Sequence, residues 1–380
     1  MIYLDHAATS SLDPVVREAM EAALRQAAGN PNSLHAAGRA ARVRIEAARA
    51  QVATVLQTEP ESIVFTSGAT ESDNLAILGA ARAARTRGLH VVTAKTEHRA
   101  VLDVVSALAR EGFSTTLLKP DAEGLISAAV VEQAVRPDTV LLSMMLVNNE
   151  TGVVQDIEAI AAVCHRRGVL LHVDAAQAVG RVPFTAASLG ADLISLSSHK
   201  IHGPMGVGAL YIRQNPRPAL VPLLFGGGQE HALRPGTLPV HQIVGMGMAY
   251  ARAHELADHE IPRLAGLTQR LWRRLQALPA IHLNGSIRYR APHILNVSFV
   301  GVDGEALRYA LPDLALSSGS ACSAGDPESS YVLRALGRDD ALAQASLRFS
   351  VGRTTTETEI DEAALAVVAA VTRLRALAPP

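Results

Sequence analysis

Residues 139–174 read TVLLSMMLVNNETGVVQDIEAIAAVCHRRGVLLHVD. Two short apolar runs, TVLLSMML and GVLLHVD, enclose an amphipathic stretch whose apolar residues recur at three-and-four spacing. Such runs are typical of buried strands, and the stretch between them is typical of a helix. A crossover helix between two strands makes those strands parallel. The same alternation extends from about residue 60 to 212, which predicts an α/β fold with a mostly parallel sheet covered by helices on both faces.

The rest of the chain divides into further regions. Residues 213–239 are rich in proline and glycine and predict a long ordered loop, and residues 241–277 carry a long helical pattern. The residues that follow predict a smaller α/β domain, while the helices expected before residue 58 could pack on either domain. We place the domain boundary within the long helix: the large domain spans residues 13–258, and the small domain spans residues 1–12 and 259–380.

Composition excludes several classes of protein. Of 380 residues, 48% are hydrophobic and 19% are charged, which is typical of a globular protein and not of a disordered one. The formal net charge of −1 supplies no general attraction for nucleic acid or for an anionic membrane, and we expect neither as a partner. No apolar run is long enough to span a membrane and the start lacks a signal-peptide pattern, so we expect a cytoplasmic protein.

Lysine usage is unusual in this chain. The 35 basic residues comprise 32 arginines and three lysines, Lys95, Lys119 and Lys200. One explanation is the chance survival of three lysines. The other is a need for amine chemistry, which arginine cannot supply because its guanidinium keeps its proton. Lys200 fits the second explanation, because it follows a predicted strand and lies among hydroxyl-bearing residues and glycines.

Polar residues follow several predicted strands at their carboxyl ends, where ligands bind in parallel sheets. Singly, each has a plain structural explanation: Thr70 could belong to an ordinary helix cap, His98 could be structural, and Asn149 could lie in a polar turn. Asp174 ends an apolar strand and needs a cation or a hydrogen-bond donor. Together the residues fit pyridoxal 5′-phosphate. They offer a phosphate site (Thr70, Ser197, His199), a carboxylate for the ring nitrogen (Asp174), a stacking ring (His98) and an amine for the aldehyde (Lys200).

The two cysteines, Cys164 and Cys322, are too few for a disulfide scaffold or a four-cysteine metal site within one chain. Cys164 lies in a predicted amphipathic helix and is expected to be a small buried hydrophobic residue. Cys322 ends the segment SSGSAC, residues 317–322, whose small residues predict a loop. An exposed loop thiol has no packing role, which favours a reactive role. We expect no intrinsic metal, although Cys322 could transiently ligate an iron–sulfur cluster shared with a partner.

Motifs along nearly the whole chain resemble those of cysteine desulfurases of the NifS/IscS type, which are class-V aminotransferase-like enzymes of pyridoxal phosphate fold-type I. The most specific motif is SSGSAC, which is similar to the longer cysteine loop of one group of these enzymes. The other motifs include YLDHAAT, FTSGATESDNLA, TEHRAVLD, VNNETGVVQDI, HVDAAQAVG, SHKIHGP, RPGTLPVHQIVGMGMAY and LRFSVGR. The resemblance implies a large cofactor-binding domain and a smaller C-terminal α/β domain that carries the Cys322 loop.

The resemblance also implies a role for each matching residue. Lys200 would bind the cofactor covalently, Asp174 would hold its ring nitrogen, and Gln177 would hold its ring hydroxyl. His98 would stack on the ring and move protons, and Cys322 would attack the substrate sulfur as a thiolate. The phosphate would be held by Thr70, Ser197 and His199 together with Thr237 of a second subunit, and Ala69 would also bind the cofactor. The substrate carboxylate would be held by Arg348 and by Asn149, which would also contact the cofactor.

The implied reaction converts L-cysteine to L-alanine and leaves a persulfide on Cys322 for iron–sulfur cluster assembly or other thiolation. The implied partners are a second copy of the chain, in a homodimer, and a sulfur-acceptor protein such as an iron–sulfur scaffold. Three features depart from the family pattern: Met205 replaces a usual lysine, Pro235 replaces a usual small residue, and only a short segment follows the last helix. The alternatives are another lyase or aminotransferase of this fold, including a selenocysteine lyase, in which Cys322 is not essential, and a non-catalytic partner that has kept the fold.

Overall fold

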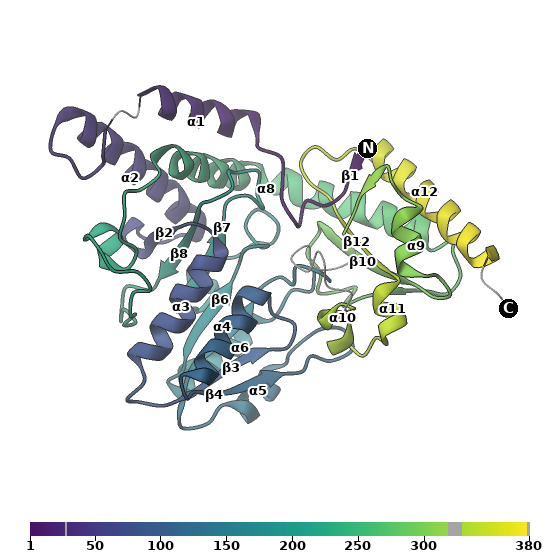
Figure 1. Ribbon diagram of the computed structural model, residues 1–380, viewed down its shortest axis with the longest axis horizontal. Coiled ribbons are helices and arrows are strands. Elements are labelled where there is room, and N and C mark those ends of the chain that lie inside the picture. The colour runs from purple at the N-terminus through teal and green to yellow at the C-terminus, as the bar shows by residue number, and fades with distance from the viewer. Residues whose placement is uncertain (27–28, 318–328, 378–380) are drawn as a thin grey trace.

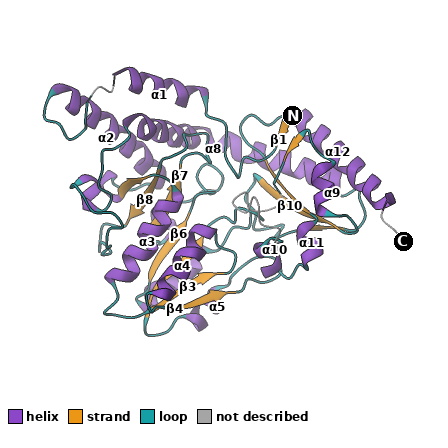
Figure 2. Ribbon diagram, viewed as in Figure 1, coloured by secondary structure: helices purple, strands orange, loops and turns teal. Residues whose placement is uncertain are grey.

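The computed structural model describes residues 1–26, 29–317 and 329–377 of the chain (Figure 1). A large sheet with helices on both faces occupies one side of the molecule (Figure 2). A smaller group of strands and helices, formed by the C-terminal part of the chain and the N-terminal strand, lies on the other side. This arrangement confirms the predicted α/β fold class. No helix in the described ranges combines the length and the apolar character needed to cross a membrane.

Among the described residues, seven strands form the large sheet, in the order β2-β8-β7-β6-β5-β3-β4. Strand β8 runs antiparallel to both of its neighbours, and the other neighbouring pairs are parallel. The carboxyl ends of the parallel strands therefore meet along one edge of the sheet. The strands are β2 (Ile63–Thr66), β3 (His90–Ala94), β4 (Ser114–Leu118), β5 (Thr139–Met145), β6 (Leu170–Asp174), β7 (Leu193–Ser197) and β8 (Gly208–Ile212).

Alternate residues of each strand point to opposite faces of the sheet, and different helices cover the two faces. Leu141 and Leu193 lie on the face that packs against α3 (Ala69–Ala83) and α4 (Arg99–Arg110). Leu142 and Ile194 lie on the opposite face, with the buried side chains of α6 (Ile157–Arg167). The strand–helix–strand unit expected over residues 139–174 is therefore β5, α6 and β6. Two shorter helices complete this region, α5 (Ala128–Ala134) and α7 (Ala186–Leu189).

The N-terminal helices pack on the large sheet, which settles a choice that the sequence left open. Buried residues of α1 (Pro14–Gln26) and α2 (Ala36–Leu56) share a hydrophobic core with the same face as α6. Both helices also contact α8 (Val240–Leu275), the long helix that was expected over residues 241–277. In Figure 1, α8 runs from beside α2 toward the C-terminal elements.

The C-terminal elements form a separate hydrophobic core. In the described ranges, three antiparallel strands are ordered β12-β10-β9, and β1 (Ile2–Tyr3) pairs in parallel with β11 (Leu314–Ala315). The first half of α8, through Ala253, belongs to the core of the large sheet, whereas Leu264 and later residues belong to this second core. The predicted boundary at residue 258 falls between those two sets and stays a prediction. The remaining elements are β9 (Ile281–Leu283), β10 (Ile294–Phe299), α9 (Gly304–Tyr309), α10 (Tyr331–Ala335), α11 (Asp340–Gln344), β12 (Ser346–Ser350) and α12 (Glu357–Leu377).

Candidate active site

A cavity of about 390 Å³ lies at the carboxyl edge of the large sheet. Its floor comes from residues at the ends of β5, β6 and β7, and its walls include Ala7, Ala8 and the buried Arg348 of β12. The structure brings most of the predicted site residues together there. They are Ala69, Thr70, His98, Asn149, Asp174, Gln177, Ser197, His199, Lys200 and Arg348.

Lys200 follows β7 and presents its amine to the cavity. Its Nζ donates hydrogen bonds to the carbonyl oxygens of Ala7 (2.6 Å) and Ala8 (2.7 Å). Gln177 Nε2 donates to the same Ala7 oxygen at 2.8 Å. The N-terminal segment therefore lies across the cavity and orients two of the predicted cofactor-binding side chains.

Asp174 is the last residue of β6, and its side chain is buried. Burial raises the pKa of its carboxyl, while the Ala176 N–H and the charges of His98 and Lys200 act in the opposite direction. The Ala176 N–H donates to Asp174 Oδ1 at 2.9 Å. A buried carboxylate at this position is suited to bind a protonated ring nitrogen, which would balance its charge.

The first turn of α3 forms the part of the cavity suited to a phosphate. The helix begins after Gly68, and within the described part of the chain no side chain caps its first N–H groups. Ser197 Oγ lies nearby in the cavity wall, buried and without a hydrogen-bond partner in the described part of the chain. Free helix N–H groups and an unsatisfied hydroxyl are suited to bind an anion. A Cβ on Gly208 would lie 2.6 Å from the Gly68 Cα, so glycine is required where β8 passes this turn.

Two histidines line the cavity beside these groups. His98 caps α4, and its Nδ1 accepts a hydrogen bond from the Ala100 N–H at 3.2 Å. His199 Nδ1 lies 3.1 Å from Thr9 Oγ1. Burial, together with the charge of Lys200, lowers the pKa of His199 to about 4, so this ring is uncharged at neutral pH.

Arg348 lies on β12 and has only 1% of its surface exposed. Its Nη1 donates to the Asn149 carbonyl oxygen at 2.9 Å, and its Nη2 donates to Asp5 Oδ1 at 2.7 Å. Among the described residues, Arg348 Nε and Asn149 Oδ1 are buried without partners. The free Nε–H of Arg348 can therefore donate to a small carboxylate inside the cavity, and Asn149 can donate to it only through its Nδ2, because Oδ1 is an acceptor.

The predicted residues Thr237 and Cys322 are not part of this cavity as described. Thr237 is exposed and does not line the cavity of its own chain. Cys322 lies outside the described residues. Cys164 is fully buried in α6, and burial raises the pKa of its thiol to about 12, which confirms the expectation of a small buried hydrophobic residue.

Sequence reasoning missed several acidic residues around the cavity. Asp73 lines it, and Asp5 forms the ion pair with Arg348. Glu97 is fully buried and accepts the Met145 N–H at 2.9 Å, and Glu150 accepts the Ser330 hydroxyl at 2.5 Å. Asp5, Glu97 and Glu150 belong to YLDHAAT, TEHRAVLD and VNNETGVVQDI, so the motifs that carry the family resemblance contained a signal for them.

Comparisons with known proteins give this geometry its context. The family model described as aminotransferase class-V matches residues 2–363. Cysteine desulfurase IscS of Photorhabdus laumondii is 52% identical over 381 aligned residues, which cover 100% of this chain and 94% of that protein. A solved NifS-like protein matches 98% of this chain and 100% of its own, with a TM-score of 0.92 and 34% identity. A structure described as SspA in complex with cysteine covers 92% of this chain and 99% of its own, with a TM-score of 0.83 and 37% identity.

The chain therefore belongs to the class-V aminotransferase family and, within it, to the cysteine desulfurases. This membership confirms the resemblance inferred from the motifs, as well as the predicted fold and enzyme class.

Proposed function

We propose that the cavity binds pyridoxal 5′-phosphate and L-cysteine, and that the chain converts L-cysteine to L-alanine while its sulfur passes to Cys322. The observation that carries this proposal is the convergence of Lys200, Asp174 and the first turn of α3 on one cavity. The Lys200 amine matches the aldehyde of the cofactor, the Asp174 carboxylate matches its ring nitrogen, and the first turn of α3 matches its phosphate. The partnerless Ser197 hydroxyl further supports the fit, because a phosphate would satisfy it.

The cofactor, when bound, withdraws electrons from the amino acid attached to it. Lys200 would hold it, Asp174 would keep its ring nitrogen protonated, and Gln177 would contact its ring hydroxyl. Ala69, Thr70, Ser197 and His199 would bind its phosphate, and His98 would stack on the ring and move protons.

Arg348 and Asn149 bind the substrate carboxylate and orient the cysteine side chain toward Cys322. The Cys322 thiolate attacks the substrate sulfur, so that an S–S bond forms while the C–S bond breaks. The carbon takes up the electron pair and a proton. The products, L-alanine and a persulfide on Cys322, together contain all the atoms of L-cysteine and the Cys322 thiol.

We further propose that the working protein is a cytoplasmic homodimer. Thr237 is exposed in its own chain and lies in the loop that follows η2 (Gln229–Ala232), so it is available to complete the phosphate site of a second copy. The persulfide would then pass to an acceptor protein such as an iron–sulfur scaffold.

An absorbance and product assay tests the proposal. The purified protein should show a visible cofactor band that changes on addition of L-cysteine, and it should form alanine. Cys322→Ser should lose alanine formation and keep the band, whereas Cys164→Ser, a matched change at the buried cysteine, should keep both. Alanine formation that survives in Cys322→Ser would instead support a lyase in which this thiol is not essential.

A further inference from the structure

Asp73 is a buried carboxyl that the reaction as described does not use. It lies in the second turn of α3, is 1% exposed, and lines the same cavity as Asp174. Among the described residues no donor makes a hydrogen bond of good geometry to either of its carboxyl oxygens, and the Ser195 hydroxyl is the one nearby donor that favours its ionised form. A buried carboxylate without donors or a cation is strongly disfavoured, so the protonation state of Asp73 needs an explanation.

The sheet beneath α3 supplies the surroundings of Asp73. His172 and Asp174 alternate along β6 and therefore point to the same face of the sheet, the face covered by α3. His172 Nε2 lies 3.5 Å from Asp73 Oδ1 and 2.8 Å from the Ser195 hydroxyl of β7. The Ser143 hydroxyl of β5 lies 2.8 Å from His172 Nδ1.

None of these neighbours is a cation that could balance an ionised Asp73. Burial lowers the pKa of His172 to about 3, so the imidazole is neutral at physiological pH. Asp174, which lines the same cavity, and the buried Glu97 are the titratable groups whose charges act on the pKa of Asp73, and both are acids. Burial raises the pKa of Asp73 well above its usual value, Asp174 and Glu97 add to the rise, and the Ser195 hydroxyl opposes it.

Asp174 is better equipped than Asp73 to carry a negative charge. It accepts the Ala176 N–H, and the positive charges of His98 and Lys200 favour its ionised form. When two buried carboxyls interact, they share one charge, and the proton resides on the group whose anion is less stabilised. Of these two carboxyls, that group is Asp73.

We propose that Asp73 is a positioning residue of the cofactor site, which carries the proton of a two-carboxyl pair and thereby leaves the single negative charge on Asp174. This rests on the proposed function, because Asp174 matters to catalysis only if a cofactor ring nitrogen lies against it. The protonation of Asp73 itself does not depend on that assignment. The two ideas can therefore fail separately.

The pH dependence of unfolding tests the proton on Asp73. A carboxyl whose pKa is raised in the folded state keeps its proton there, whereas the same carboxyl in the unfolded chain loses its proton above about pH 4. The free energy of unfolding therefore falls progressively as pH rises from about 4 to the folded pKa. In Asp73→Asn this contribution is absent. The unfolding midpoint of the purified protein, at saturating pyridoxal phosphate, should therefore fall less steeply with pH in the variant than in the wild type.

The expected difference in slope is about 1–2 °C per pH unit between pH 5.5 and 8.5. Asp103→Asn is the matched control, because that side chain is 72% exposed on α4 and its removal should leave the slope unchanged. Equal slopes for Asp73→Asn and the wild type would overturn the proposal.

Two spectroscopic measurements test the proton on Asp73 further, and the first uses the wild-type protein, so it does not require Asp73→Asn to fold. In wild-type protein labelled with ¹³C on the aspartate side-chain carboxyl, an isotope-shifted infrared band of a protonated carboxyl should persist at pH 7.5, and its absence would overturn the proposal.

In the loaded Asp73→Asn variant, the pH midpoint of the visible cofactor band should stay at the wild-type value, because asparagine is as neutral as a protonated aspartate. A fall of more than about half a pH unit would mean that Asp73 is ionised in the wild type. A protein that takes up no cofactor would refute the proposed function and leave the first two tests intact.

Discussion

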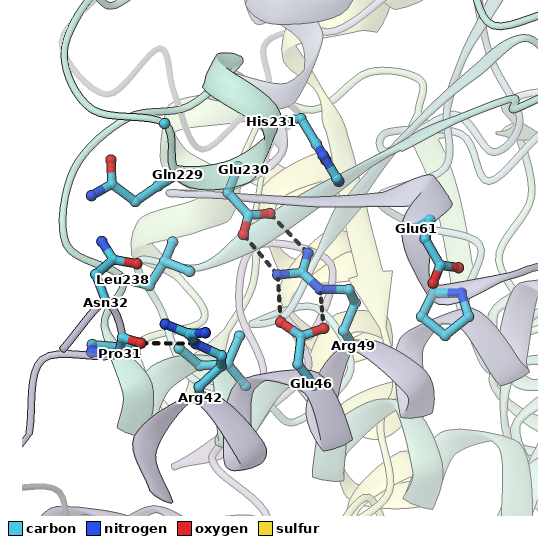
Figure 3. Close-up of a pocket in the computed structure, with 13 residues that line it drawn as sticks. Pro31, Asn32, Arg42, Glu46, Arg49, Glu61, Gln229, Glu230, His231 and Leu238 are labelled. Atoms are coloured by element: carbon cyan, nitrogen blue, oxygen red, sulfur yellow. Dashed lines mark hydrogen bonds and ion pairs between the residues drawn. The ribbon is translucent and has the colours of Figure 1, made fainter. Parts of the chain in front are cut away.

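Arg49 and Glu230 form a buried, two-pronged ion pair at the outer edge of strand β2 (Figure 3). Arg49 Nη2 lies 2.7 Å from Glu230 Oε1, and Nη1 lies 2.9 Å from Oε2. The same two side chains bind the backbone of β2, because Arg49 donates to the Ile63 carbonyl oxygen and Glu230 accepts the Phe65 N–H, both at 2.7 Å. The pair thus occupies the place of a neighbouring strand and satisfies an edge that would otherwise be unpaired.

This ion pair connects a distant loop to the phosphate end of the cavity. Strand β2 leads directly into the first turn of α3, and Arg234, four residues after Glu230, pairs with Glu71 in that turn at 3.1 Å. Glu71 in turn accepts the Ser67 N–H at 2.6 Å. The segment that precedes Thr237 therefore contacts both strand β2, through Glu230, and the first turn of α3, through Arg234. That turn is the one that we assign to the phosphate.

Glu230→Gln should destabilise the protein strongly. The change removes the buried partner of Arg49 and leaves this buried cation with only the half-exposed Glu46, and breaking a buried pair in this way typically costs about 3–5 kcal/mol. Denaturant unfolding measures this loss. Glu46→Gln removes the other acidic partner of Arg49, but Glu46 is 55% exposed, so its loss should cost less than about 1 kcal/mol. Similar losses for the two variants would show that burial does not set the strength of the Glu230 contact.

Ala232→Gly should stabilise the protein. Ala232 has a φ of +60°, a left-handed conformation that costs an L-residue about 1 kcal/mol and costs glycine little. We expect a gain of about 0.5–1 kcal/mol in the free energy of unfolding. The same change at Ala162, which is exposed in the middle of α6, should lower stability by about 1 kcal/mol. A loss at Ala232 would mean that the left-handed turn is not kept in solution.

The sequence predicted where the site lies because strand ends and their polar residues are local features. The apolar runs ending at Asp174 and Ser197 identified two strands, and parallel strands bring their carboxyl ends together without knowledge of any contact. The pairing of Asp5 with Arg348 could not be found in this way, since 343 positions separate the two residues and no periodic pattern links them.

Buried acids were hidden for a different reason. Asp73 occupies a position in α3 that a helical pattern assigns to a polar surface, and only the packing of that helix on the sheet shows that the residue faces the core. Short elements such as strand β9 and helix α11 are hidden from periodicity as well, because segments of three and five residues are too short to show a period.

Gly208→Ala should weaken cofactor binding. A Cβ at this position would lie 2.5 Å from the Leu196 carbonyl oxygen and 2.6 Å from the Gly68 Cα, so the first turn of α3 must shift. Overpacking of this kind costs about 1–3 kcal/mol, and we expect an increase of about tenfold or more in the dissociation constant for pyridoxal phosphate. Gly228→Ala is the control, because a Cβ there meets no atom within 4 Å and its φ of −86° suits alanine. Fluorescence titration of pyridoxal phosphate into the cofactor-free proteins measures the dissociation constant of each variant.

Arg348→Lys should impair substrate binding although the positive charge is kept. The guanidinium of Arg348 donates to Asn149 and Asp5 at the same time and still has a buried Nε without a described partner. A lysine ammonium cannot reproduce this fork, so the substrate carboxylate loses a two-pronged partner and Asp5 loses part of its own. We expect kcat/KM for L-cysteine to fall by about 10- to 100-fold, mainly through KM, while the visible cofactor band is retained. Arg308→Lys, an exposed change on α9, should leave both kinetic constants unchanged. A fall in kcat alone would place the role of Arg348 in the chemical step instead of in the binding of the carboxylate.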